Sequence, residues 1–206
     1  MKIKLSEEIY KDLKKKVLLN RLKPGDMIVE EQLVQQYHVS RTPVRQALQQ
    51  MERLGLVEIR DGVGTFVTYI TPQQMKDAYQ IRCAAEKIAI ASAINNITNE
   101  DLTPMEEKFK KFKTQLAKGG GYGASFEEMI KADWALHDMI IHKSDNSLLN
   151  ESIEKVTLIL RRYQMAYVTL YERATEDHLE IIRCLREKDL KGAYQILESH
   201  LQYRTF

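Results

Sequence analysis

The sequence has little cysteine, no long apolar run and almost no net charge. Its 206 residues include only two cysteines, Cys83 and Cys184, whose spacing matches no metal-binding or redox pair, so we expect buried free thiols. No apolar run approaches the roughly 20 residues that cross a bilayer. The basic start leads into charged residues rather than into the apolar region of a signal peptide. We therefore expect a cytoplasmic protein with no membrane partner.

The formal net charge of +2 excludes no class of partner by itself. Divided at residue 70, the first part carries 12 lysines and arginines against 9 acidic residues, and the rest is slightly acidic. A modest excess can serve DNA binding, because counterion release depends on the few cations that meet phosphates. The charge therefore permits the first part to bind nucleic acid.

The segment from residue 39 to residue 48 has the features of a helix that reads DNA. Either Ser40 or Thr42 can cap this helix, and Pro43 suits its first turn in both cases. Arg41 and Arg45 lie four residues apart on one face. The rear face repeats apolar residues at three- and four-residue steps, at Val44, Leu48, Met51 and Leu54. The pattern predicts a cationic face toward DNA and an apolar face toward the domain core.

The flanking segments predict a winged helix-turn-helix domain over residues 1–70. Helical spacing extends over residues 6–19 and 30–37, and strand patterns follow at 57–60 and 65–69. Glycines in the intervening loop permit the positive φ of a tight hairpin, which forms the wing. The alternative is a small helical module whose arginines are only solvated surface.

From residue 71 to residue 206 the pattern changes to long helices without strands. We expect a helical bundle with helices at about 72–95, 99–118, 124–144, 147–171, 173–187 and 189–203. The glycine cluster at 119–123 lacks the lysine and the strand of a nucleotide loop, so it predicts a flexible connection. The expected fold class is mainly α, with a winged helix-turn-helix followed by an all-α bundle.

Potential metal ligands stand out in this helical part, at Asp133, His137, His178 and His200. The first two are four residues apart, so one helix face presents both side chains to a single cation. The other two lie on later helices beside residues expected to face inward. Each could equally be an ordinary hydrogen-bonded histidine. His38 and His142 show no comparable partner and are interpreted as structural or exposed.

The first 70 residues resemble the GntR family of bacterial transcription regulators. The resemblance rests on residues 22–26, Glu30, Leu33, 40–45, 47–48 and 54–57. It implies that Arg41, Thr42 and Arg45 contact bases or backbone, that Arg53 meets phosphate, and that Gly64 approaches the minor groove. The chain departs from the family at Val63, a wing position that often carries a cation.

The second part resembles the C-terminal ligand-binding (FCD) domain of FadR-like regulators. The Asp-x-x-x-His pair, residues 176–182 and residues 189–201 carry this resemblance. It implies that the four candidate ligands hold a divalent metal which binds the carboxylate of a small metabolite. Imidazole and carboxylate suit zinc, nickel, manganese or iron. Arg82 matches an Arg-x-x-x-Glu pattern and could grip the effector carboxylate, or simply pair with Glu86.

Together these resemblances imply a transcription regulator without a catalytic residue. We expect a repressor that binds inverted-repeat, double-stranded operator DNA as a homodimer and responds to a small organic acid. Two alternatives stay open: a regulator that senses an acyl-coenzyme A thioester without metal, and a metal-dependent helical enzyme. The second lacks an evident general base beyond the ligands.

Overall fold

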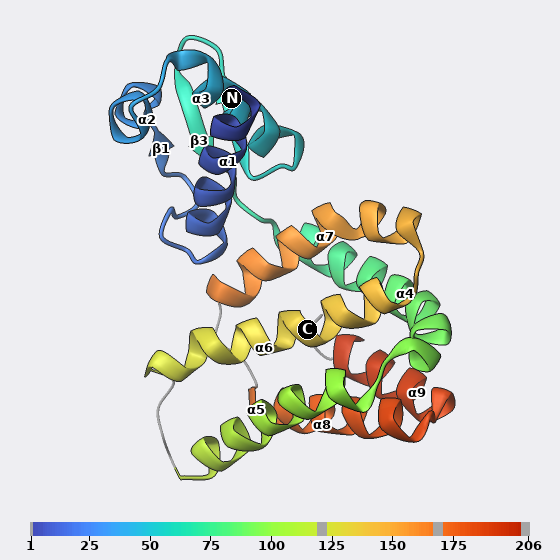
Figure 1. Cartoon of the computed structure of the whole chain (residues 1–206). Helices are drawn as coiled ribbons and strands as arrows, with labels where there is room; N and C mark the ends of the chain where they lie inside the picture. Colours follow the sequence, from blue (N-terminus) through green and yellow to red (C-terminus); the bar gives the residue numbers. More distant parts are fainter. Residues whose placement is uncertain (1, 119–122, 167–170, 203–206) are drawn as a thin grey trace. The chain divides into compact units, whose positions relative to one another are not determined.

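The computed structural model describes residues 2–118, 123–166 and 171–202 of the chain (Figure 1). The chain divides into two compact units, one of Met1–Thr71 with Arg161–Ala166 and one of Pro72–Leu160 with Tyr167–Phe206. The first unit combines helices with a small sheet. In the second, the described residues form helices and no strand.

The first unit is built on three helices and a three-stranded sheet. Its elements in chain order are α1 (Lys2–Leu18), β1 (Met27–Ile28), α2 (Glu30–Tyr37), α3 (Arg41–Arg53), β2 (Val57–Arg60) and β3 (Gly64–Val67). Helix α3 packs against α1, α2 and β2. Val44, Leu48 and Met51 are buried, which confirms most of the apolar rear face expected from their spacing. Leu54, the fourth expected member, is only half-buried because it lies at the C-cap, where the helix ends. The winged helix-turn-helix fold is therefore confirmed.

The sheet has the antiparallel order β1-β3-β2. Strands β2 and β3 form the predicted wing hairpin, with Arg60 opposite Gly64. The turn requires positive φ at Gly62 (+69°) and Gly64 (+145°), which explains the two glycines. The sequence did not predict β1, because a strand of two residues shows no detectable alternation.

Helix α3 begins where the sequence predicted, but its first turn differs from expectation in one contact. Ser40 occupies the N-cap position with extended backbone, yet its side chain makes no capping hydrogen bond. Pro43 therefore lies inside the first turn, where it removes no helical hydrogen bond. The start of α3 depends on this backbone geometry and on burial of the rear face.

The second unit is a bundle of α4 (Pro72–Asn96), α5 (Asn99–Ala117), α6 (Gly123–Lys143), α7 (Ser147–Ala166), α8 (Tyr171–Glu187) and α9 (Leu190–Gln202). These bounds agree with the predicted helices to within a few residues. Most of the glycine cluster, residues 119–122, lies outside the described residues. The same holds for residues 167–170, near the predicted end of the 147–171 helix.

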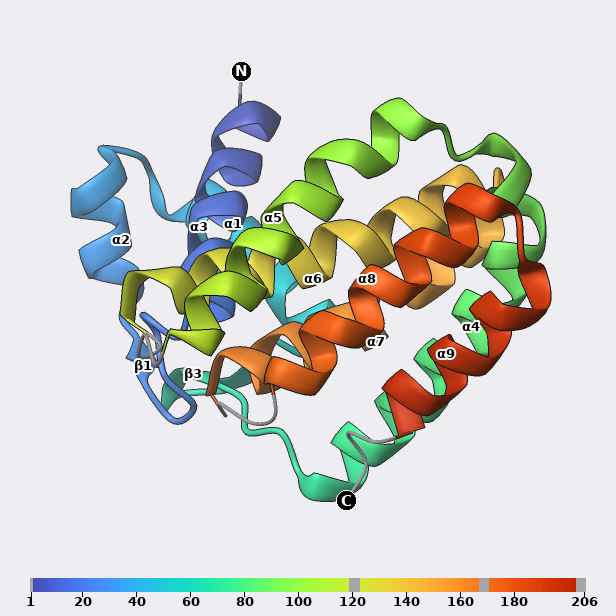
Figure 2. The same ribbon diagram turned by 90° about the horizontal axis from the view of Figure 1, so that it is seen from below.

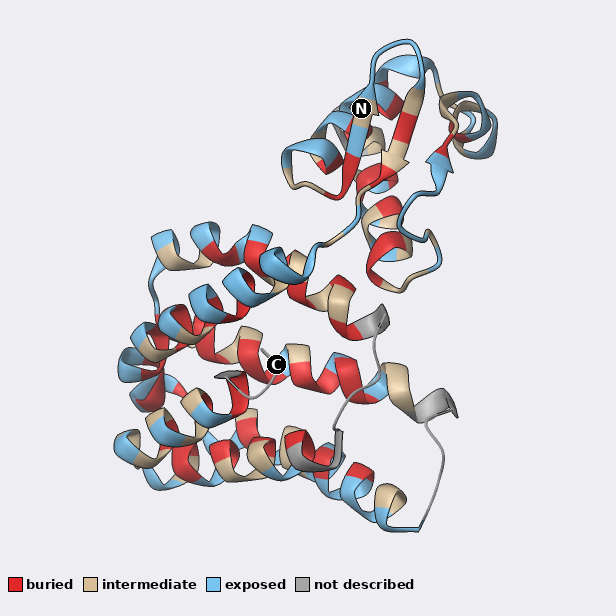
Figure 3. Cartoon of the chain, turned by 180° about the vertical axis from the view of Figure 1, so that it is seen from behind, coloured by how far each residue is buried: buried red, intermediate tan, exposed pale blue. Residues whose placement is uncertain are grey.

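Packing within the bundle brings α6, α8 and α9 together around α4 and α5. Helix α4 packs against α6 and α9, α5 packs against α8 and α6, and α9 also contacts α8 (Figure 2). The buried residues of these helices face one another, and the exposed ones face outward (Figure 3). A hydrophobic core therefore surrounds any polar group that these helices carry on their inner faces.

Side-chain hydrogen bonds stabilise the start of α5 and the end of α4. Thr98 caps α5 in a reciprocal capping box with Asp101, whose carboxylate also accepts from Lys143 Nζ at 2.6 Å. Lys188 Nζ donates to the carbonyls of Ile94 (2.6 Å) and Ile97 (2.8 Å) at the end of α4. These contacts hold α4 and α5 against their neighbours.

Cysteine burial agrees only in part with expectation. Both thiols are free; Cys184 is buried, but Cys83 is half-buried, because its position on α4 lies at the edge of the packed face. Burial raises the pKa of each thiol. Among the described residues, no helix is both long enough and apolar enough to cross a membrane.

Candidate functional site

Helix α3 presents its polar face to solvent. The side chains of Arg41 and Arg45 are 66% and 61% exposed, and Thr42 and Arg53 are exposed too. All four lie on the side of the helix away from the buried residues. They are available to a ligand, as a helix that enters the major groove requires.

Two acidic residues at the start of α2 restrain these arginines. Arg41 Nη2 donates to Glu31 Oε2 and Arg45 Nε donates to Glu30 Oε2, each at 3.0 Å. Sequence reasoning missed this pairing, because the partners lie 10 and 15 residues apart on different helices. The two exposed arginines of α3 are therefore paired with acidic residues of α2 in this structure.

A groove of about 530 Å³ lies between α3 and the wing, lined among others by Arg45, Gln49, Arg60 and Val63. Arg60 lies over the Phe66 ring, 4.8 Å from its centroid, and pairs with Glu58 at 2.9 Å. Val63, at the turn, is 62% exposed. Gly64 follows it at the start of β3 and is half-buried. The wing thus offers one cation at its stem, Arg60, and carries exposed Asp61 and Val63 at its turn.

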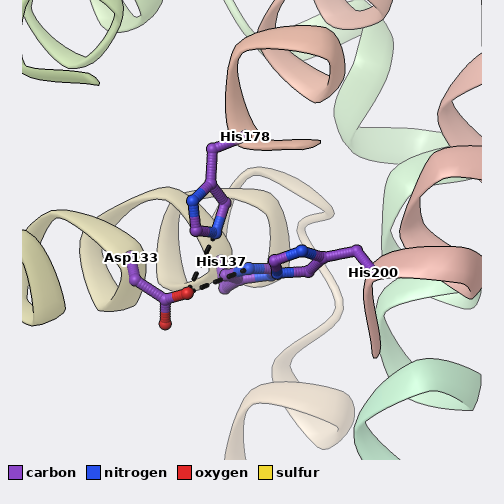
Figure 4. Close-up of side chains that lie close together, drawn as sticks. All are labelled: Asp133, His137, His178 and His200. Carbon is purple, nitrogen blue, oxygen red and sulfur yellow. Dashed lines mark ion pairs between the residues drawn. The ribbon is translucent and has the colours of Figure 1, made fainter. Parts of the chain in front are cut away.

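The second unit brings the four predicted metal ligands together (Figure 4). Asp133 and His137 come from α6, His178 from α8 and His200 from α9. One donor atom from each lies within 4.8 Å of all the others, and every side chain is at least 96% buried. His178 Nε2 lies 2.9 Å from Asp133 Oδ1, and His137 Nε2 lies 3.9 Å from the same oxygen.

The donor set fits a divalent metal ion. Ligand bonds of about 2 Å place the donor atoms around one ion roughly 3 to 4 Å apart, close to the separations in this cluster. Imidazole nitrogen and carboxylate oxygen are both ligands that such ions accept. His137 Nε2 is buried without a hydrogen-bond partner within the described part of the chain, as expected of a nitrogen reserved for a ligand.

Helix α4 adds a buried ion pair beside the cluster. Glu86 accepts from Arg82 Nε at 2.6 Å and contacts His137 Nδ1 at 2.5 Å, while Arg82 Nη2 lies 3.9 Å from Asp133 Oδ2. Burial alone would raise the pKa of Glu86, but His137 and Arg82 outweigh this effect and hold the pKa below its usual range. Arg82 therefore lies next to the predicted ligands.

The sequence analysis did not predict that two acidic residues contact histidines of the cluster. Glu86 was considered only as a partner of Arg82, and Asp177 was not singled out. Asp177 Oδ2 lies 3.2 Å from His200 Nδ1. No local pattern signals either contact, because each joins two helices far apart in the chain. His38 and His142, which lack a role in the cluster, are both exposed.

Known proteins resemble the chain along nearly its whole length. It is 26% identical over 199 residues to the HTH-type transcriptional regulator YdhC of Bacillus subtilis strain 168, covering 95% of this chain and 87% of that protein. It is 25% identical over 205 residues to the transcriptional regulator McbR of Escherichia coli K12, covering 97% and 90%. It is 24% identical over 201 residues to the transcriptional repressor RspR of the same strain, covering 96% and 86%.

The solved structure of E. coli McbR/YncC has the same fold. Its TM-score is 0.79 at 24% identity, with 97% of this chain and 94% of that one covered. Within the sequence, residues 5–67 match the gntR family of bacterial regulatory proteins, and residues 77–203 match the FCD domain.

A winged helix-turn-helix followed by a helical FCD domain is the architecture of a DNA-binding transcriptional regulator and not of an enzyme. The chain belongs to the gntR family of bacterial regulatory proteins, in the group that carries an FCD domain. Regulators of this family bind operator DNA, and an FCD domain indicates a small-molecule effector. The resemblance inferred from the motifs is confirmed.

Proposed function

We propose that this regulator is a repressor that binds an inverted-repeat operator as a homodimer and releases it when a small organic acid binds the helical domain. The observation that carries the proposal is the convergence of four buried potential ligands from three helices. Similarity to RspR, which is named a repressor, supports the sign of regulation. A cytoplasmic location stays a prediction.

The proposed operator contacts are those that the motif resemblance implies. Arg41, Thr42 and Arg45 contact bases or backbone, Arg53 meets phosphate, and Gly64 approaches the minor groove. Exposure of the first four on the solvent side of α3 supports this assignment. Because the wing turn carries exposed Asp61 and Val63 and no cation, α3 carries more of the specificity than the wing.

In the helical domain, the four ligands hold a divalent ion of the zinc, nickel, manganese or iron group. When bound, an ion that accepts six ligands has room for carboxylate oxygens beside four protein donors. Arg82 contacts the effector carboxylate: its Nε is engaged by Glu86, and the rest of its guanidinium can donate to an anion near the ion. The proposed metal ion and the Arg82 guanidinium are both positively charged, so together they suit a small carboxylate.

Release of the operator requires that the acid bind the DNA-competent and DNA-incompetent forms with different affinity. A ligand that bound both forms equally would leave the DNA affinity unchanged, however tightly it bound. The effector is therefore recognised experimentally by its effect on operator affinity and not by binding alone.

The test combines elemental analysis with operator binding of the full chain. We expect close to one divalent ion per chain and release of operator DNA by a member of a panel of small carboxylates. His178→Ala removes a ligand and should abolish both, while His142→Ala, an exposed histidine on α6, should leave both unchanged. Equal metal content in the wild type and His178→Ala would refute the metal site. If an acyl-coenzyme A thioester instead releases the metal-free protein from operator DNA, the alternative of a metal-free sensor is supported.

A further inference from the structure

Glu86 lies between two hydrogen-bond donors inside the bundle. Its Oε1 accepts from Arg82 Nε at 2.6 Å, and its Oε2 lies 2.5 Å from His137 Nδ1. Only 1% of Glu86 and 7% of Arg82 is exposed, so water does not compete for these positions. Both carboxylate oxygens therefore have a defined partner.

This arrangement selects one form of the His137 ring. A carboxylate only accepts, so the Nδ1 that faces Oε2 carries the proton. A metal ion binds the neutral imidazole, which has a single N–H, so a proton on Nδ1 leaves Nε2 with its lone pair. Nε2 is the atom that faces the cluster, 3.9 Å from Asp133 Oδ1. The ring thus presents a lone pair rather than a proton to the place where the ligand atoms converge.

We propose that Glu86 is the positioning residue of the metal centre: it holds His137 in the Nδ1–H tautomer that can ligate a cation, and Arg82 holds Glu86 in place. The inference rests on the metal site proposed above and adds the residues that prepare it. Arg82 has this role because an arginine side chain cannot accept a hydrogen bond. It therefore always claims one acceptor of residue 86.

His200 shows a related but looser arrangement. Asp177 Oδ2 lies 3.2 Å from His200 Nδ1, and the Asp177 side chain is 19% exposed. This contact is longer and less buried than that of Glu86, so the orientation of an amide at position 177 is less constrained. An amide at position 86 has a fixed orientation, because Arg82 requires the oxygen. The two positions should thus respond differently to the same chemical change.

Glu86→Gln is the discriminating variant, because glutamine has nearly the same size but only one acceptor. Its oxygen faces Arg82, so its NH₂ group faces His137 Nδ1 and requires that atom to accept. The proton then moves to Nε2 and points into the cluster. We expect zinc affinity to fall about 10- to 100-fold, the usual effect of losing such a partner. Asp177→Asn should lower the zinc affinity less than Glu86→Gln does.

Removing the competing donor should reverse the defect. In the double variant Arg82→Met with Glu86→Gln, the amide oxygen is available to His137, so the Nδ1–H tautomer and most of the zinc affinity return. A purely structural ion pair predicts the opposite, since the double variant loses even more of it. Glu198→Gln is the matched control, because it also replaces a carboxylate that pairs with a cation of α4, in this case Lys87, the residue after Glu86.

The measurements are zinc titration against a chromophoric chelator and long-range ¹H–¹⁵N spectra of histidine-labelled, metal-free protein. Signals of His137 are assigned by their loss in His137→Gln. We expect the Nδ1–H tautomer in the wild type and the Nε2–H tautomer in Glu86→Gln. An Nε2–H tautomer in the wild type, or unchanged zinc affinity in Glu86→Gln, overturns the inference. A wild type that binds no divalent ion overturns the metal site itself, and the tautomer spectra distinguish that failure from a wrong assignment of Glu86.

Discussion

Arg45 Nε donates a hydrogen bond to Glu30 Oε2 at 3.0 Å, so an exposed arginine of α3 is paired with an acid of the preceding helix. The neighbouring pair, Arg41 with Glu31, has the same length. Both arginines are more than half exposed, and exposed ion pairs contribute at most about 1 kcal/mol to stability. If α3 contacts the operator as proposed, we expect these acids to affect DNA affinity more than folding.

Glu30→Gln should strengthen binding to non-specific DNA and lower the free energy of unfolding by at most about 1 kcal/mol. The variant removes a negative charge beside the phosphates and releases Arg45, and up to about 1 kcal/mol corresponds to roughly fivefold in affinity. Fluorescence anisotropy at two salt concentrations measures this change. Glu7→Gln on α1, an acid paired with Lys11, is the control. Equal effects of the two variants would contradict a specific role for Glu30.

Replacing Arg41 or Arg45 by alanine should weaken operator binding by about 1 to 3 kcal/mol each, because the guanidinium groups contact base edges or phosphates. Circular dichroism should stay native, since both side chains are exposed. Arg21→Ala, an exposed arginine outside α3, serves as the control. Unchanged operator affinity in both α3 variants would show that this helix does not read the operator.

The protein should be a dimer at micromolar concentration and protect an inverted repeat. One recognition helix reads too short a half-site to distinguish an operator within a genome, so two helices related by a two-fold axis are expected. Light scattering gives the mass of the free protein, and footprinting gives the protected sequence. A monomer that protects a single, unrepeated half-site would refute this proposal.

Chelation should lower the melting temperature of the wild type by several degrees. An ion that binds only the folded state stabilises it by about 2.7 kcal/mol when present at 100 times its Kd. His178→Ala should melt at the same temperature with and without chelator, and His142→Ala should behave as the wild type. Operator binding without effector should survive in all three proteins. A chelator effect of equal size in His178→Ala would place the stabilising ion elsewhere.

Local sequence patterns were sufficient for the winged helix and for the long helices of the bundle. The burial of Val44 and Met51 and the turn at Gly62 depend on neighbouring residues, so spacing and backbone preference reveal them. The same patterns failed for β1, whose two residues pair with β3 only because the hairpin lies beside them. They also misjudged Ser40, which occupies the cap position without making the capping bond.

The cluster of four potential metal ligands depends partly on local sequence and partly on the tertiary structure. Sequence alone determined that Asp133 and His137 share a helix face, because four residues make about one helical turn. That His178 and His200 meet them was decided by the packing of α8 and α9 against the other helices. Only the tertiary structure brings Glu86 of α4 to His137 and Asp177 of α8 to His200. Hydrogen-bond partners on separate helices depend on which faces pack together, and that is a property of the whole folded core, not of any local pattern.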